Sequence, residues 1–134
     1  MPDMYCLLNH KLTEKQIKDA RNRLRVSNIV NLPEHLSKIW SNIKPEGELE
    51  IDKLSLIVNW LDNSAKKNDY ILIQGEFGAV FFITDYCFSA GFTPVYATTY
   101  RKYKEKLEEN GSIERMHVFK HVQFRKFKRW KKLK

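Results

Sequence analysis

The chain has few cysteines, glycines and prolines. Its 134 residues include two cysteines, five glycines and four prolines. Cys6 and Cys87 lie far apart and have no C-x-x-C spacing, so we predict two buried, reduced thiols. The sequence also has no internal repeat, low-complexity block or linker. We therefore expect one folded unit over residues 1–127, followed by a short tail over residues 128–134.

Long apolar runs are missing as well. No run approaches the roughly 20 residues that a membrane-spanning helix needs. The first residues, MPDMYCLLNHK, place an acid before the apolar stretch and lack the shape of a signal peptide. Hydrophobic residues make up 43% and charged residues 30% of the chain. These features predict a cytoplasmic globular protein that makes no membrane contact.

Acidic residues are absent from the C-terminal end. Residues 115–134 contain nine Lys or Arg and no Asp or Glu, one charge more than the net +8 of the whole chain, so residues 1–114 carry −1. Aromatic residues stand between these charges, which would suit weak RNA contact through phosphates and base stacking. The alternative is a solvated tail whose aromatic residues close the core.

Apolar periodicity predicts alternating strands and helices. We expect strands over residues 4–9, 28–32, 70–74 and 94–99, and helices over residues 13–25, from Pro33 to about 43, over 50–66 and over 79–90. Asn110-Gly111 predicts a hairpin between residues 103–108 and 113–119, although a helix over residues 101–109 is an alternative. Repeated strand–helix units favour an α/β fold whose mostly parallel sheet carries helices on both faces and a C-terminal β-hairpin.

Three polar stretches fall at the carboxyl ends of predicted strands, where ligands of such sheets bind. They are Asn9-His10-Lys11, Gln74 to Gly78, and Ala97 to Arg101. The first pairs a possible acid or base with a cation. The third offers the hydroxyls of Thr98 and Thr99 and the guanidinium of Arg101 to phosphate oxygens.

The second stretch, Gln74-Gly75-Glu76-Phe77-Gly78, leads from a strand into a helix. Backbone N–H groups at Gly75 and Gly78 could hold an anion there, while Glu76 would suit a ribose hydroxyl and Phe77 could stack on a base. The alternative is that the glycines only allow a sharp turn and that Phe77 packs. The stretch is neither a P-loop nor a G-x-G-x-x-G motif.

A last candidate set lies in the C-terminal strand. His117 and His121, four residues apart, would share one strand face with Phe119, Gln123 and Arg125. No Cys, Asp or Glu lies in that segment to complete a metal site, so we predict no metal and no cofactor.

Several stretches resemble a family of small type III CRISPR-associated ancillary proteins of the ring-nuclease group. The likeness spans about residues 5–127, and its most specific motifs are QGEFGA (74–79) and HVFKHVQFRK (117–126). The resemblance implies a Rossmann-like sheet related to CARF domains, homodimerisation, and a ring-nuclease activity that cleaves cyclic oligoadenylate, first of all cyclic tetra-adenylate. Such an activity would switch off type III CRISPR signalling. The tail from Lys128 departs from the pattern.

A cyclic 3′–5′ oligoadenylate carries its own nucleophile, the ribose 2′-OH, so cleavage is mainly a matter of positioning and needs no metal. We expect His10 or Glu76 to handle the 2′-OH, and His121, Lys120 or Arg125 to supply positive charge or a proton. The remaining predicted substrate-binding residues are Asn9, Lys11, Gln74, Gly75, Phe77, Gly78, Thr98, Thr99, Arg101 and His117. A sensor that holds the ring without cutting it would use the same residues. The other alternative is an RNA-binding protein that acts through the basic C-terminal end.

Overall fold

The computed structural model describes residues 1–133, except for the side chains of residues 102–104, 106 and 114–118. Strands and helices alternate from the N-terminus, as the apolar periodicity predicts. The elements are β1 (Met4–Leu7), α1 (Glu14–Asn22), β2 (Ile29–Asn31), α2 (Glu34–Ser41), α3 (Ile51–Ser64), β3 (Tyr70–Ile73), α4 (Phe77–Ala90), β4 (Thr93–Leu107) and β5 (Ile113–Lys126).

The five strands form one mixed sheet in the order β2-β1-β3-β4-β5. Strands β1, β2, β3 and β4 run parallel to one another, and β5 runs antiparallel to β4. The predicted α/β sheet with a C-terminal hairpin is therefore confirmed. Strand order reverses between β1 and β3, and their carboxyl ends mark the place where such sheets bind ligands.

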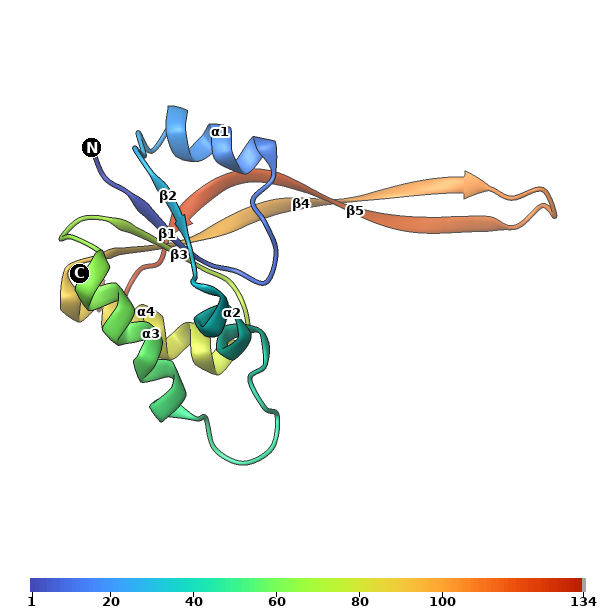
Figure 1. The fold of residues 1–134 in the computed structure, drawn as a ribbon. Helices are drawn as coiled ribbons and strands as arrows, with labels where there is room; N and C mark the ends of the chain where they lie inside the picture. Colours follow the sequence, from blue (N-terminus) through green and yellow to red (C-terminus); the bar gives the residue numbers. More distant parts are fainter. Residues whose placement is uncertain (134) are drawn as a thin grey trace.

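Helices cover both faces of the sheet. Figure 1 shows α1 on one face and α2, α3 and α4 on the other. Alternate residues of the strands serve the two sides, because successive side chains of a strand point to opposite faces. Tyr5 and Leu7 pack with α2, α3 and α4, whereas Met4 and Cys6 pack on the side of α1.

The two cysteines are buried in different halves of this core, as predicted. Cys6 belongs to the cluster under α1 and Cys87 to the cluster under α2, α3 and α4. Burial raises the pKa of both thiols to about 12, so the reactive thiolate is strongly disfavoured.

Local signals in the sequence set the ends of helices α1 and α4. Thr13 and Gln16 form the predicted capping box, in which each side chain accepts a hydrogen bond from the other residue's backbone N–H. Helix α4 ends at Gly91, whose φ of 82° is the left-handed conformation that favours glycine.

Strands β4 and β5 are much longer than the rest of the sheet. Strand β3 pairs with β4 only through Tyr70–Thr93, Ile71–Pro94 and Leu72–Val95, so beyond Val95 the strand β4 pairs with β5 alone. Figure 1 shows that this ribbon projects from the body. We call residues 99–121 the arm. The predicted strand over 94–99 and the predicted hairpin strand are one element, and the alternative helix over residues 101–109 is not formed.

A β-bulge marks the place where the arm leaves the body. Thr98 is opposite Gln123 and Thr99 is opposite His121, so Val122 is an extra residue in β5. The bulge reverses the alternation of side chains along β5. His121 and Phe124 consequently share the face that carries α1.

Residues 127–133 follow β5 without forming a helix or strand. Phe127 packs against Tyr96, with ring centroids 4.7 Å apart and the two ring planes tilted by 48°. Arg129 lies over the ring of Phe88 in α4, 5.1 Å from its centroid. The described part of the predicted tail thus folds back on α4. Among residues 1–133, no helix has both the length and the apolar character needed to span a bilayer.

Candidate functional site

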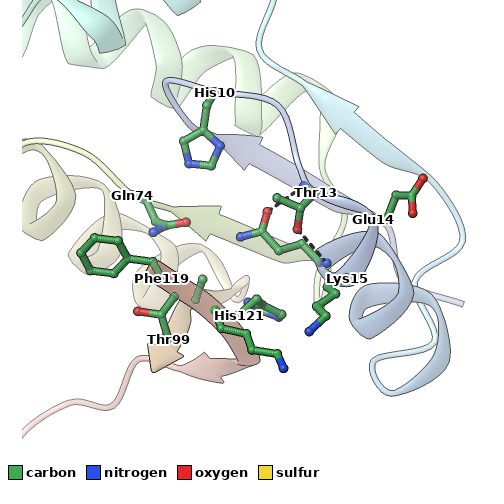
Figure 2. A pocket seen from close by; sticks show the side chains of 11 residues that line it. His10, Thr13, Glu14, Lys15, Gln74, Thr99, Phe119 and His121 are labelled. Atoms are coloured by element: carbon green, nitrogen blue, oxygen red, sulfur yellow. Dashed lines mark hydrogen bonds between the residues drawn. The ribbon is translucent and has the colours of Figure 1, made fainter. Parts of the chain in front are cut away.

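A cleft of about 860 Å³ opens where the arm, helix α1 and the carboxyl ends of β1 and β3 meet (Figure 2). Its position at the reversal of strand order is the one that α/β sheets use for ligands. The described lining residues are His10, Thr13, Glu14, Lys15, Gln16, Gln74, Ala97, Thr99, Phe119, Lys120 and His121. Five of the predicted site residues are in this set: His10, Gln74, Thr99, Lys120 and His121.

The main polar contact beside this cleft joins α1 to β5. Nε2 of His121 lies 3.0 Å from Oδ2 of Asp19, and both side chains are almost enclosed, with 6% and 9% of their surfaces exposed. Because a carboxylate accepts, the Nε2 atom of His121 carries the proton and donates to Asp19. This contact fixes the ring orientation and the tautomer of His121.

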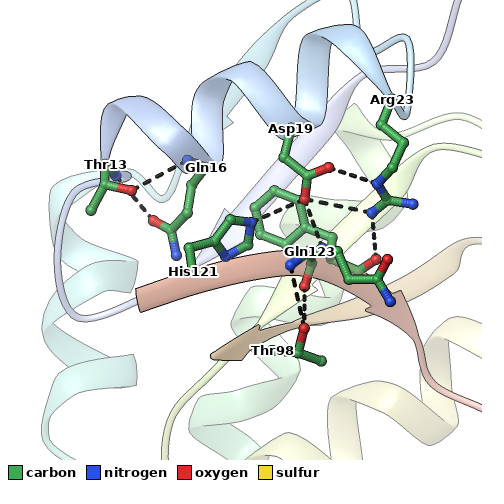
Figure 3. A network of polar contacts seen from close by, with 8 residues as sticks. Thr13, Gln16, Asp19, Arg23, Thr98, His121 and Gln123 are labelled. Carbon is green, nitrogen blue, oxygen red and sulfur yellow. Dashed lines mark hydrogen bonds and ion pairs between the residues drawn. The ribbon is translucent and has the colours of Figure 1, made fainter. Parts of the chain in front are cut away.

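Asp19 is itself held by three donors (Figure 3). Its Oδ1 accepts from Nε of Arg23 at 2.7 Å, and its Oδ2 accepts from the backbone N–H of Phe124 at 2.7 Å as well as from His121. Burial by itself raises the pKa of Asp19, but the hydrogen bonds from Arg23, His121 and Phe124 outweigh it and hold the pKa below its usual value. Asp19 is therefore a fixed negative charge behind His121.

Two buried polar atoms of residues that line this cleft are left without partners in the described part of the chain. They are Nδ1 of His121 and Oε1 of Gln74. Buried polar groups are nearly always hydrogen-bonded, and exceptions call for an explanation such as a bound group or a chemical role. With Nε2 tied to Asp19, Nδ1 is the ring atom of His121 that remains for proton transfer.

His10 faces the same cleft from the loop after β1 (Figure 2). Its Nδ1 lies 2.9 Å from the carbonyl oxygen of Lys11. A carbonyl can only accept, so Nδ1 carries the proton and neutral His10 has its lone pair on Nε2. His10 and His121 thus bring two proton-transfer groups, one from the loop after β1 and one from β5, to one cleft.

The arm adds an aromatic ring and positive charge at the mouth of the cleft. Phe119 lines the cleft and is exposed, and Cζ of Arg101 lies 5.3 Å from the centroid of its ring. Lys15 and Lys120 also line the cleft. An exposed ring beside lysines is suited to a nucleobase next to a phosphate.

The predicted anion cradle at the start of α4 is wrong. The carboxylate of Glu76 accepts hydrogen bonds from the backbone N–H groups of Gly78 and Ala79, both at 2.9 Å. Those bonds lower the pKa of Glu76. The side chain caps its own helix, so the Gly78 donor is occupied and Glu76 is neither aimed at the cleft nor suited to act as a base.

Gly75 has a packing role. Trp40 donates a hydrogen bond from Nε1 to the carbonyl of Gln74 at 2.8 Å, which places the indole ring over the turn. A Cβ atom at position 75 would come 3.0 Å from Nε1 of Trp40. The alternative interpretation of the two glycines, a sharp strand-to-helix turn, is the one that the contacts support.

Other predicted site residues lie away from the cleft. The hydroxyl of Thr98 donates to the carbonyl of Gln123 at 2.9 Å and so closes the bulge. Arg125 contacts the ring and hydroxyl of Tyr96, because the bulge turns it to the opposite face from His121. Phe77 is 92% exposed and borders a different hollow beside α4.

Asn9 and Lys11 are exposed, and neither is among the described residues that line the cleft; Asn9 instead accepts a hydrogen bond from Ser41 at 3.1 Å. Arg101 lies over the ring of Phe119 and is not among the described residues that line the cleft. The side chain of His117 lies outside the described residues. The described side chains include no group of three His, Cys, Asp or Glu placed to hold a metal ion.

Sequence reasoning missed Asp19, Arg23 and the first turn of α1. The signal present in the sequence is a polar line of Gln16, Asp19 and Arg23 beside the apolar stripe of that helix. Nothing local indicates that this line meets a strand more than 100 residues later, as His121 and Asp19 do.

Comparison with known proteins places these features in a family. No solved structure matches the chain. A protein of Methanocaldococcus jannaschii described as "Uncharacterized protein MJ1673" is 41% identical over 127 residues, which cover 95% of this chain and 98% of that protein. The family model described as "Uncharacterized protein MJ1673 family" matches residues 2–125. This chain belongs to that family.

Proposed function

We propose that the cleft binds a cyclic oligoadenylate, cyclic tetra-adenylate first of all, and cleaves it by attack of a ribose 2′-OH on the adjacent phosphate. The observation that carries the proposal is the pair of histidines in one cleft, with His121 oriented by Asp19 and His10 oriented by the carbonyl of Lys11. The resemblance to type III CRISPR-associated ring nucleases selects the substrate class.

His10 is the proposed base. Its Nε2 takes the proton of the 2′-OH as the 2′ oxygen bonds to phosphorus, while the bond from phosphorus to the 5′ oxygen breaks. The product is a linear adenylate with a 2′,3′-cyclic phosphate at one end and a 5′-OH at the other. Because the nucleophile belongs to the substrate, placing it in line with the leaving oxygen is the main task of the protein.

His121 is the proposed acid. Its Nδ1 gives a proton to the leaving 5′ oxygen, and the Asp19 carboxylate, 3.0 Å from Nε2, stabilises the positively charged ring from which that proton comes. A positioned acid or base of this kind typically raises the rate by about 10²- to 10⁴-fold. Asp19 touches no reacting atom and serves as a positioning residue.

Lys15 and Lys120 would face the phosphates, and Phe119 would stack on an adenine. Thr99 and Gln74 offer further hydrogen-bonding groups in the cleft. The buried, unpartnered Oε1 of Gln74 would accept from the amino group of a base that enters deeply.

A sensor that binds the ring without cutting it is the second candidate. It is favoured by the burial of Nδ1 of His121, which must become reachable before it can transfer a proton. Cleavage requires Nδ1 of His121 to become exposed when the ligand enters, whereas binding at the exposed lining residues, such as Phe119 and Lys120, does not.

The test is incubation of the protein with cyclic tetra-adenylate in EDTA, followed by chromatography of the products. We expect linear adenylates that end in a 2′,3′-cyclic phosphate, and a loss of about 100-fold or more in rate for His10→Ala and His121→Ala. Retention of the intact ring would favour the sensor. Activity that appears only with an added divalent metal would overturn the mechanism.

A further inference from the structure

A second hollow lies beside α4, on the face of the sheet opposite the cleft. It has a volume of about 640 Å³ and is bordered by α4 and by the segment that follows β5. Four of its aromatic residues, Phe77, Phe81, Phe88 and Trp130, define what we call the aromatic groove. The volume is in the range of about 300–1,000 Å³ that is typical of ligand pockets.

The aromatic groove exposes unusually large apolar side chains. Phe77, Phe81 and Trp130 are 92%, 74% and 88% exposed. Each such ring can bury about 150–250 Å², so together they present on the order of 400–600 Å², the size at which an exposed patch indicates an interaction site. The exposed positions of helix α4 are Phe77, Phe81, Asp85 and Ser89, so the first half of its outer side is apolar and carries two exposed rings.

Positive charge lies along one side of the groove. Lys128, Arg129, Lys131 and Lys132 follow β5, and Lys128 and Arg129 border the groove directly. Asp85 offsets only part of this charge and lies 3.9 Å from Arg129. A partner segment that fits this surface should therefore combine apolar side chains with acidic ones.

The tip of the arm, residues 107–113, has that composition. Leu107 and Ile113 are opposite each other in the last pair of the ribbon and are 74% and 61% exposed. Glu108 and Glu109 stand between them in the turn, and the sequence LEENGSI contains no basic residue. The tip is thus an apolar pair beside two negative charges.

We propose that the arm tip of one copy of this chain docks in the aromatic groove of a second copy. Leu107 and Ile113 would cover the exposed rings, and Glu108 and Glu109 would face Lys128 and Arg129. A tip cannot fill the groove of its own chain, because the arm projects from the body on the side away from the C-terminal end (Figure 1). In a two-fold dimer the contact forms twice, which doubles the apolar area that it buries.

This association does not depend on nucleotide cleavage. The arm tip and the aromatic groove include none of the residues that line the cleft. Failure of the cleavage experiment therefore leaves the docking proposal intact, and failure of docking leaves the cleavage mechanism intact.

The test measures the mass of the full chain in solution by light scattering and sedimentation. We expect twice the 16.0 kDa of a single chain for the unmodified protein. The tip variant Leu107→Ser with Ile113→Ser and the groove variant Phe81→Ser with Trp130→Ser should each be monomeric. All four side chains are exposed, so folding should be retained and is checked by circular dichroism. Tyr100→Ser, an exposed arm residue outside the tip, is the matched control and should remain dimeric.

Mixing the two monomeric variants gives a sharper test. The tip variant retains an intact groove and the groove variant an intact tip, so an equimolar mixture should recover pairs through one remaining contact. Likewise, Glu108→Lys with Glu109→Lys should abolish association and should be rescued by mixing with Lys128→Glu and Arg129→Glu, the two basic residues that border the groove. A monomeric unmodified protein, or an assembly that persists in the tip variant, would overturn the proposal.

Discussion

The indole ring of Trp40 occupies the space that a side chain at position 75 would need. A Cβ atom on Gly75 would lie 3.0 Å from Nε1 and 3.1 Å from Cε2 of that ring. Trp40 is almost completely buried and is hydrogen-bonded to Gln74, so it has little freedom to move.

Gly75→Ala should therefore destabilise the protein by about 1–3 kcal/mol, the usual cost of overpacking a filled site. Gly78→Ala is the matched control, because a Cβ there would meet only the flexible Glu76 carboxylate, at 3.4 Å, within a helical turn. Alanine is favoured over glycine in a helix by up to about 1 kcal/mol, so Gly78→Ala should be neutral or stabilising. Urea denaturation measures the free energy of unfolding of both variants. An equal loss of this free energy in the two variants would contradict the packing role of Gly75.

Asp19→Asn should reduce both cleavage and stability. Asparagine keeps the shape but removes the charge that Arg23, His121 and the Phe124 amide share. Hydrogen bonds to charged groups contribute about 1.5–3 kcal/mol each, so we expect a loss of about that size in unfolding free energy. Cleavage should fall by at least 10-fold, with a changed pH profile that a purely structural defect would not produce. Arg23→Gln is the control, since it leaves the contact between Asp19 and His121 in place.

Acid should remove the contribution of Asp19 to stability. Its pKa is lower in the folded chain than the value of about 3.9 expected when unfolded. The unfolded state therefore binds the proton first, and stability from Asp19 is complete above about pH 5 and is lost as pH falls through the folded pKa. Thermal unfolding of the unmodified protein and Asp19→Asn should thus converge between about pH 5 and pH 2. A difference in unfolding temperature between the two proteins that grows as the pH falls would contradict this prediction.

Phe119→Ala should weaken adenylate binding by about 1–3 kcal/mol, the usual effect of losing one stacked base, while Phe119→Trp should retain it. Tyr100→Ala offers a matched control, because Tyr100 is a neighbouring exposed aromatic residue of the arm that is not among the described residues of the cleft. Fluorescence titration with cyclic tetra-adenylate distinguishes the two. Equal weakening by both substitutions would remove Phe119 from the site.

Glu76→Gln should lower the midpoint of thermal unfolding without changing the rate of ring cleavage. The carboxylate caps α4 through Gly78 and Ala79, and an amide accepts those bonds less strongly. Glu76→Asp, which retains a capping carboxylate, should recover part of the loss. A large fall in cleavage with unchanged stability would instead restore Glu76 as a catalytic residue.

The sequence predicts most of the fold because its signals are local. The Thr13 capping box, the Gly91 helix end and the Asn110-Gly111 turn each act within a few residues, and each lies where the structure has it. The position of the cleft follows too, because strand order in an α/β sheet dictates where carboxyl ends meet.

The missed parts of the site depend on contacts that no local pattern encodes. Glu76 turns back to its own helix instead of toward a ligand, a choice between two roles that one residue type can play equally well. The bulge at Val122 changes which side chains of β5 share a face, so His121 is retained and Arg125 is lost from the predicted set. The role of Asp19 could not be predicted, because its partner His121 is 102 positions away in the sequence.

The arm is joined to the body through the bulge at Val122, and beyond His121 its strands pair only with each other. Beyond the pair Arg101–Phe119, its length can therefore change in steps of two residue pairs, which keep the faces of the ribbon, without removing a residue that lines the cleft. Removing two residues from each strand would draw the tip back by about 7 Å, at about 3.4 Å per residue. The number of residue pairs in the arm therefore sets the distance between the sheet and the arm tip, and with it the distance at which the tip could contact another molecule.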